Sequence, residues 1–314
     1  MKHTKRVFVV AFSFFICLNT FGQKNIENNL TPEHKNIKGT KISLIPPAGF
    51  SDSSAVLQHA ESGAVILIID FPFPYSAASQ GFTKKVLSEK GFKVNKIEKL
   101  IINGFSSKFI TGTVEGTQVG YYLVLGSSKE TILIIGTHPK KMKNIGQEIK
   151  KSMLTAYYEM NKKINPFEEI DYSIDVSETR LKFANTMMTT LIFTEDGTFP
   201  SSSEYQTSLL VGKSLTENLQ DDRKEIAISN RKKVALDIDC SEKYIREISI
   251  DGINGYEMYE KGTLNGDNKT KITLYYVTLF DDNGYYYILC GFTGDPTDES
   301  MDEMQKAIKT FKRK

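Results

Sequence analysis

The sequence of 314 residues is poor in the side chains from which catalytic and metal sites are commonly built. It contains 3 cysteines and 4 histidines, and none of them falls in a Cys-x-x-Cys or His-x-x-x-His spacing. It also lacks the nucleotide-binding loops Gly-x-x-x-x-Gly-Lys and Gly-x-Gly-x-x-Gly, and the Gly-x-Ser-x-Gly turn of serine hydrolases. We therefore expect no cofactor, no resident metal and no catalytic residues.

A net positive charge of the kind that nucleic-acid-binding proteins carry is also absent. The chain has 40 basic and 38 acidic residues, and three of the basic ones lie in the first 22 residues. The charge is unevenly spread, because residues 23–165 carry 19 basic and 11 acidic residues, whereas residues 166–314 carry 18 and 27. The opposite net charges of the two halves indicate that the two parts dock on each other or face different partners. Variation among solvated surface residues is the alternative.

Residues 1–22 have the pattern of a secretory signal peptide. Three basic residues, Lys2, Lys5 and Arg6, precede a nearly continuous apolar run over residues 7–18. Small residues follow at Thr20 and Gly22, and the run is too short for a membrane span of about 20 residues. We predict export to the periplasm or the exterior, with no membrane span left after cleavage. An uncleaved N-terminal anchor is the alternative.

The rest of the chain divides into two parts of similar length. Residues 23–39 are polar and predict a flexible leader, residues 40–160 a first α+β domain, residues 161–171 a linker and residues 172–314 a second domain. In both parts an Asn-Gly or Asp-Gly hairpin signal is followed by further strands, and a helix that begins near a proline closes the part. We predict two tandem modules, each a mainly antiparallel sheet packed with helices in an αβα-like sandwich.

The segment Lys41-Ile42-Ser43-Leu44-Ile45-Pro46-Pro47-Ala48-Gly49-Phe50 is similar to the opening of PsbP-like domains. Such domains begin with an alternating strand, followed by Pro, a small residue, Gly and an aromatic residue. The resemblance covers residues 40–158 and reaches the second half through the repeat alone. It implies a fold that is used mostly for binding and assembly, although fold does not determine function.

Histidines that could take part in chemistry are confined to the first half. His59, near Glu61, and His138, before Pro139, could form a zinc or hydrolase site if the fold brought them together. Their spacing does not require this, and a capping or buried histidine is the plainer interpretation.

Tyrosines and the remaining cysteines give weaker signals. Tyr122, Tyr276 and Tyr286 stand on neighbouring predicted strands and could form an exposed row that binds a partner; half-buried strand residues are the alternative. Cys240 and Cys290 could form a disulfide in an oxidising compartment, or be buried free thiols.

These observations favour an exported, non-enzymatic binding or assembly module of the bacterial cell envelope. Its partner would be a protein or another envelope component, and not a nucleic acid. Two alternatives stay open: a hydrolase with a site near His59 and His138, and a carrier of a small apolar ligand between sheet and helix.

Overall fold

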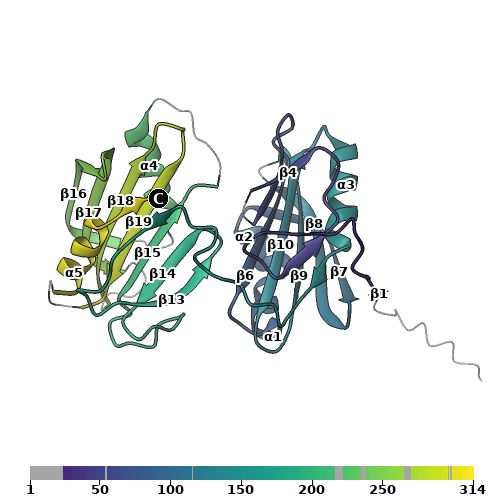
Figure 1. The fold of residues 1–314 in the computed structure, drawn as a ribbon, viewed down its shortest axis with the longest axis horizontal. Helices are drawn as coiled ribbons and strands as arrows, with labels where there is room; N and C mark the ends of the chain where they lie inside the picture. Colours follow the sequence, from purple (N-terminus) through teal and green to yellow (C-terminus); the bar gives the residue numbers. More distant parts are fainter. Residues whose placement is uncertain are drawn as a thin grey trace, which may run out of the picture.

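The computed structural model describes residues 24–53, 55–114, 116–215, 222–234, 238–264, 270–295, 297 and 299–314. The predicted signal peptide lies outside the described residues. Figure 1 shows two bodies side by side, one built from the first half of the chain and one from the second half. Each body is centred on its own large β-sheet.

The first half forms an eight-stranded sheet in the order β1-β7-β8-β9-β10-β6-β5-β4. Its neighbours are antiparallel except for β1, which runs parallel to β7. A small sheet, β11-β3-β2, lies beside it. The strands are β1 (Lys24–Ile26), β2 (Lys35–Asn36), β3 (Ile42–Leu44), β4 (Phe50–Ser53), β5 (Val56–His59), β6 (Val65–Phe71), β7 (Phe92–Ile102), β8 (Phe105–Val114), β9 (Gln118–Gly126), β10 (Thr131–Pro139) and β11 (Tyr157–Tyr158). The helices are α1 (Tyr75–Ala78), a 3-10 helix (Ser79–Gly81), α2 (Lys84–Glu89) and α3 (Lys143–Leu154).

The second half forms a seven-stranded antiparallel sheet in the order β13-β14-β15-β19-β18-β17-β16. Its small companion sheet pairs β12 with β20. The strands are β12 (Tyr172–Ser173), β13 (Lys182–Met187), β14 (Thr190–Thr194), β15 (Ser208–Lys213), β16 (Ile238–Ile250), β17 (Ile253–Leu264), β18 (Lys271–Phe280), β19 (Tyr286–Thr293) and β20 (Lys312–Arg313). The helices are α4 (Arg223–Lys233) and α5 (Glu299–Lys309).

The strand orders of the two large sheets coincide when β1 is set aside. Read from one edge, β4-β5-β6-β10-β9-β8-β7 corresponds to β13-β14-β15-β19-β18-β17-β16. The hairpin turns also match, since Asn103 and Asp251 both adopt a positive φ and each is followed by a glycine with positive φ, as a two-residue turn requires. The correspondence extends to the helices before β7 and β16 and after β10 and β19. The two halves therefore repeat one topology.

The predicted α+β class is wrong, because the described part of the chain is mostly β, with 47% strand and 17% helix. The described residues contain five α-helices, none longer than 12 residues. The apolar pattern of residues 79–90 fits one helix, but the structure divides this segment into the 3-10 helix and α2, which begins only after Thr83, whose side chain accepts from the backbone N–H of Val86. The strands that follow the helices α2 and α4 are long, with 11 residues in β7 and 13 in β16. The helices thus cover patches of the sheets and do not form complete layers.

The segment expected to be a flexible leader is instead paired with the first half. Residues 24–26 form β1, and its last carbonyl, that of Ile26, accepts a hydrogen bond from Asn103 N–H. Further along, the side chain of Asn28 donates to the carbonyls of Leu154 and Ala156. β1 thereby covers the outer edge of β7 at residues 100–102, whereas among the described residues no strand pairs with the outer edge of β16.

Each large sheet carries apolar side chains on both of its faces. In the first half, α3 packs over one face and α2 over the other. In the second half, α5 and α4 take the corresponding places. Glycines allow the close approach of α3 and α5, because a Cβ at Gly136 would lie 2.4 Å from Ile149 and one at Gly291 would lie 2.8 Å from Met304.

A candidate binding cleft between the two halves

A cleft of about 530 Å³ opens where the two halves meet. One wall comes from β6, the segment before β3 and the turn before β10, and the other from β13. The chain between the halves runs along it. The charged residues that line the cleft are Lys41, Asp70, Glu130, Lys162 and Lys163. Clefts between domains are common sites for ligands.

Asp70 is the unusual side chain of this cleft. It continues the row of Ile66 and Ile68 on the core-facing side of β6, so its carboxyl enters a position that the strand pattern reserves for apolar groups. Its Oδ1 is buried and has no hydrogen-bond partner. Burial, reinforced by the negative charge of Glu130 and opposed by Lys41, raises the pKa of Asp70 to about 7. This carboxyl is therefore partly protonated at neutral pH.

Glu130 already has two strong partners. Lys41 Nζ lies 2.7 Å from both carboxylate oxygens of Glu130, and the Tyr158 hydroxyl donates to Oε1 at 2.5 Å. The pairing of β11 with β3 brings Tyr158 opposite Ile42 and hence next to Lys41. Burial raises the pKa of Tyr158, and its hydrogen bond to Glu130 adds to the shift, so the phenol stays a donor. Lys41 is therefore committed to Glu130.

The cluster holds the carboxyl groups of Asp70 and Glu130 and the ammonium group of Lys41, whose positive charge stabilises the ionised form of both. With both carboxyls ionised it carries one uncompensated negative charge in a poorly hydrated place, which costs free energy. A cationic group placed against Asp70 would remove that cost. Lys162 donates to the carbonyl of Thr40 at 3.4 Å and, with the exposed Lys163, makes the mouth of the cleft positive. The arrangement can bind a cation inside and an anion at the mouth.

The predicted tyrosine row is not an exposed surface. Tyr122 belongs to the first sheet and stacks on Phe92 with ring centroids 4.4 Å apart. Tyr276 is fully buried on the α4 face of the second sheet, and Tyr286 is half-buried against Phe280. These residues do not share a contiguous outer face, because the sheets that carry them are separate.

His59 and His138 lie level with each other on one face of the first sheet, with Ala64 of the intervening strand between them. Two strand spacings separate them, or about 10 Å. The ring of His138 is engaged at both nitrogens, by the carbonyl of Pro139 and the hydroxyl of Tyr121. Within the described residues, no group of three or more His, Cys, Asp or Glu is arranged to hold a metal ion. The hydrolase alternative therefore draws no support from this pair.

Cys240 and Cys290 are free thiols, and the disulfide considered as one possibility for them is not formed. They stand on β16 and β19, which are separated by β17 and β18. Three strand spacings alone amount to about 14 Å, and Cys240 is further displaced along β16, because Ile245 is the residue level with Cys290; both separations put the thiols beyond the reach of a disulfide. Burial raises the pKa of both thiols, that of Cys290 to about 12, which keeps them protonated.

The sequence analysis overlooked Asp70, although a signal was present. Residues 64–71 form a nearly continuous apolar run in the sequence, but the alternation that places Ile66 and Ile68 in the core also places Asp70 there. Lys41 and Glu130 are 89 positions apart and carry no such local signal. Among the described residues, no helix has the length and apolar character needed to cross a membrane.

Comparisons with known proteins assign no family to the chain. No family model matches it, and neither does any curated protein sequence. Among solved structures, the apo form of TplEi, described as a T6SS immunity protein of Pseudomonas aeruginosa, is 8% identical with a TM-score of 0.31, covering 89% of this chain and 97% of that one. A protein described as a thioesterase II from Thermobifida fusca is 7% identical with a TM-score of 0.16, covering 60% and 73%. Likenesses at this level carry no functional argument, and the PsbP-like resemblance stays a prediction.

Proposed function

We propose that this chain is an exported, non-enzymatic binding protein of the bacterial cell envelope that holds its ligand in the cleft between its two halves. The observation that carries the proposal is the Asp70 carboxyl, which lies in the cleft with one oxygen buried and unpartnered. A buried charge without a partner costs stability, and such sites cluster where proteins bind or react.

The ligand that this geometry favours is a zwitterion, such as a peptide end or an amino-acid-like solute. Its protonated amine would meet Asp70, which lacks a cation because Lys41 is held by Glu130. Its anionic group would meet Lys162 and Lys163 at the mouth of the cleft. A ligand with several positive charges would be repelled at that mouth.

Calorimetric titration of the mature protein with di- and tripeptides tests the proposal. We expect binding at pH 8 that weakens at pH 5.5, since a cation prefers the ionised form of Asp70. N-acetylation of the peptides removes the amine and should abolish binding, as should Asp70→Asn. Asp52→Asn, at an exposed position of the same sheet, is the matched control and should bind normally. Peptides that bind the Asp70→Asn variant as tightly as the wild type would exclude this site.

Export is tested separately by the mass of the protein recovered from the cell envelope. Removal of residues 1–22 would give a mature chain that begins at Gln23. Full-length protein that is retained in the membrane would instead support the uncleaved anchor.

A further inference from the structure

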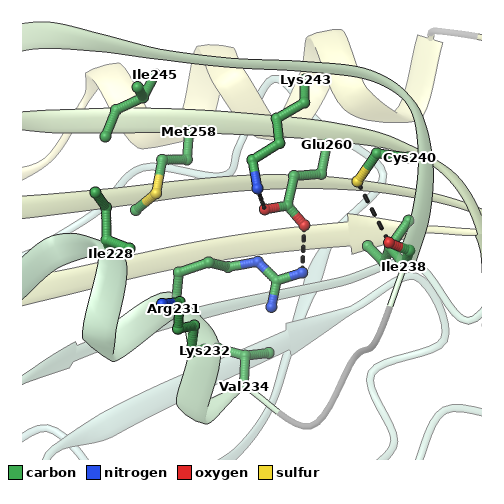
Figure 2. A pocket seen from close by; sticks show the side chains of 10 residues that line it. All are labelled: Ile228, Arg231, Lys232, Val234, Ile238, Cys240, Lys243, Ile245, Met258 and Glu260. Carbon is green, nitrogen blue, oxygen red and sulfur yellow. Dashed lines mark hydrogen bonds and ion pairs between the residues drawn. The ribbon is translucent and has the colours of Figure 1, made fainter.

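A second cavity, of about 550 Å³, lies between α4 and the outer strands β16 and β17 of the second sheet. Figure 2 shows apolar side chains on two of its sides and a chain of charged groups at its centre. Met258 is buried at its floor, opposite Ile245 on the neighbouring strand. Its lining residues are Ile228, Arg231, Lys232, Val234, Ile238, Cys240, Lys243, Ile245, Met258 and Glu260. A volume of this size is typical of small-ligand sites.

The first half provides an internal comparison, because its equivalent space is filled. Counted from the matched hairpin turns, Val114 corresponds to Gly262, and the residues paired with them are Phe92 and Cys240. The ring of Phe92 packs on Tyr122 and lies so close over β8 that a Cβ at Gly112 would be 2.4 Å from it. In the second half a cysteine replaces this ring. The cavity therefore lies where the other module places a phenyl group.

The same comparison shows that charge has been added to the site. Val94 and Gly112 of the first half correspond to Lys243 and Glu260, which pair across β16 and β17. Glu260 is buried and accepts from Arg231 of α4, and Lys243 lies 3.5 Å from its other carboxylate oxygen (Figure 2).

With Lys232 at the rim, the cavity has three cationic side chains and one anionic side chain. Its walls are apolar and its net charge is positive, a combination that suits an apolar chain with an anionic head. Cys240 is an unsuitable nucleophile, because burial raises the pKa of its thiol.

We propose that this cavity binds the acyl chain of an amphipathic anion. The chain would pack against Met258, Ile245 and Ile228 in the space that Phe92 fills in the first half. The carboxylate or phosphate head would accept hydrogen bonds from Lys243, whose side chain is 63% exposed at the mouth, and from Lys232. This site is separate from the cleft that contains Asp70, so the two proposals stand or fall independently.

Calorimetric titration with octanoate, decanoate and dodecanoate tests the proposal on the mature protein. Each added methylene should tighten binding about fourfold until the cavity is full. Decyltrimethylammonium, which has the same chain and the opposite charge, should not bind. Comparing the affinity for lysophosphatidylglycerol with the affinity for free decanoate distinguishes a lipid ligand from a free fatty acid. Affinity that does not depend on chain length, or equal binding of the cationic detergent, would overturn the proposal.

Cys240→Phe restores the ring that the first half carries and should abolish binding of decanoate. Ile97→Phe, which adds a ring at an exposed position of β7 in the other sheet, is its control and should bind normally. Lys243→Glu should weaken decanoate binding at least tenfold without closing the cavity. Circular dichroism and thermal unfolding establish that each variant is folded, and Ile228→Phe fills the cavity from α4 if Cys240→Phe fails this test. A folded, cavity-filled variant that binds as tightly as the wild type would refute the site.

Discussion

Asp70 and Lys213 occupy the same place in the two repeated sheets. Asp70 lies four residues after the β6 residue that pairs with Gly136. Lys213 lies four residues after the β15 residue that pairs with Gly291, the glycine of the second half that corresponds to Gly136. In the second half Lys213 is satisfied by Asp171 at 2.5 Å. In the first half the signs are exchanged, but Lys41, at the place of Asp171, is held by Glu130. Asp70 is thus the member of this charge arrangement that has lost its partner.

Asp70→Asn should stabilise the protein at pH 8 and change little at pH 4. The pKa of Asp70 is about 7 when folded and about 3.9 when unfolded, so the folded chain holds a proton that the unfolded chain loses first. The free energy of unfolding of the wild type therefore falls as pH rises from 4 through 7, by about 2–4 kcal/mol, and the variant escapes this fall. Denaturant unfolding of the wild type and the variant at pH 4 and pH 8 measures this difference in the free energy of unfolding. Asp52→Asn should show no such difference, and an Asp70→Asn variant that is less stable at pH 8 would contradict the assignment.

Glu130→Gln should lower the pKa of Asp70 well below 7. The substitution removes a neighbouring negative charge and releases Lys41, which can then pair with Asp70. Carboxyl-carbon NMR titration of the variant and the wild type gives the comparison directly. Glu148→Gln removes an exposed carboxyl of α3 and should leave the titration of Asp70 unchanged. If Asp70 titrates identically in the Glu130→Gln variant and the wild type, burial alone sets its pKa.

Glu260→Ala should cost about 3–5 kcal/mol of the free energy of unfolding. Glu260 and Arg231 are both buried and paired, and removing Glu260 takes away the carboxylate that Arg231 contacts. The double variant Arg231→Met, Glu260→Ala should be more stable than the single variant, because it removes the buried guanidinium as well. Urea unfolding of the wild type, both single variants and the double variant at pH 7 measures the difference. If the double variant loses the sum of the two single losses, the pair is not coupled.

Gly146→Ala should destabilise the protein, although alanine is the better helix former. Gly146 lies in α3 against His138, and a Cβ there would be 2.1 Å from the imidazole Nε2. Helix propensity favours the substitution by about 1 kcal/mol, but overpacking typically costs about 1–3 kcal/mol and here also breaks the bond from His138 to Tyr121. Asn144→Ala, on the exposed side of the same helix, should be neutral or stabilising. Thermal unfolding separates the two.

The arrangement of strands was predictable where short-range chemistry determines it. The Asn103-Gly104 and Asp251-Gly252 turns and the strands that flank them follow from positive-φ preferences and alternation. The amount of helix was not predictable in the same way, because a helix over residues 79–90 and a 3-10 segment followed by α2 share one apolar pattern.

The candidate sites were less predictable than the strands. Asp70, Lys41 and Glu130 meet through β3, β6 and the turn before β10, and pairing over such separations leaves no mark in a local window. The cavity beside Cys240 could be located only after register had shown that Phe92 is its counterpart. Tyr276 was misplaced because alternation assigns a residue to a face of the sheet but does not say whether a helix covers that face.

The pairing of β1 with β7 would connect removal of the proposed signal peptide to completion of the first sheet. β1 begins at Lys24, one residue after the first position of the proposed mature chain. While the proposed signal peptide is still attached at the translocation machinery, β1, which covers residues 100–102 at the rim of the first sheet, would be tethered there. Proteolytic release and the final closing of that rim would then be a single maturation step, which protects an aggregation-prone border as soon as the protein is set free.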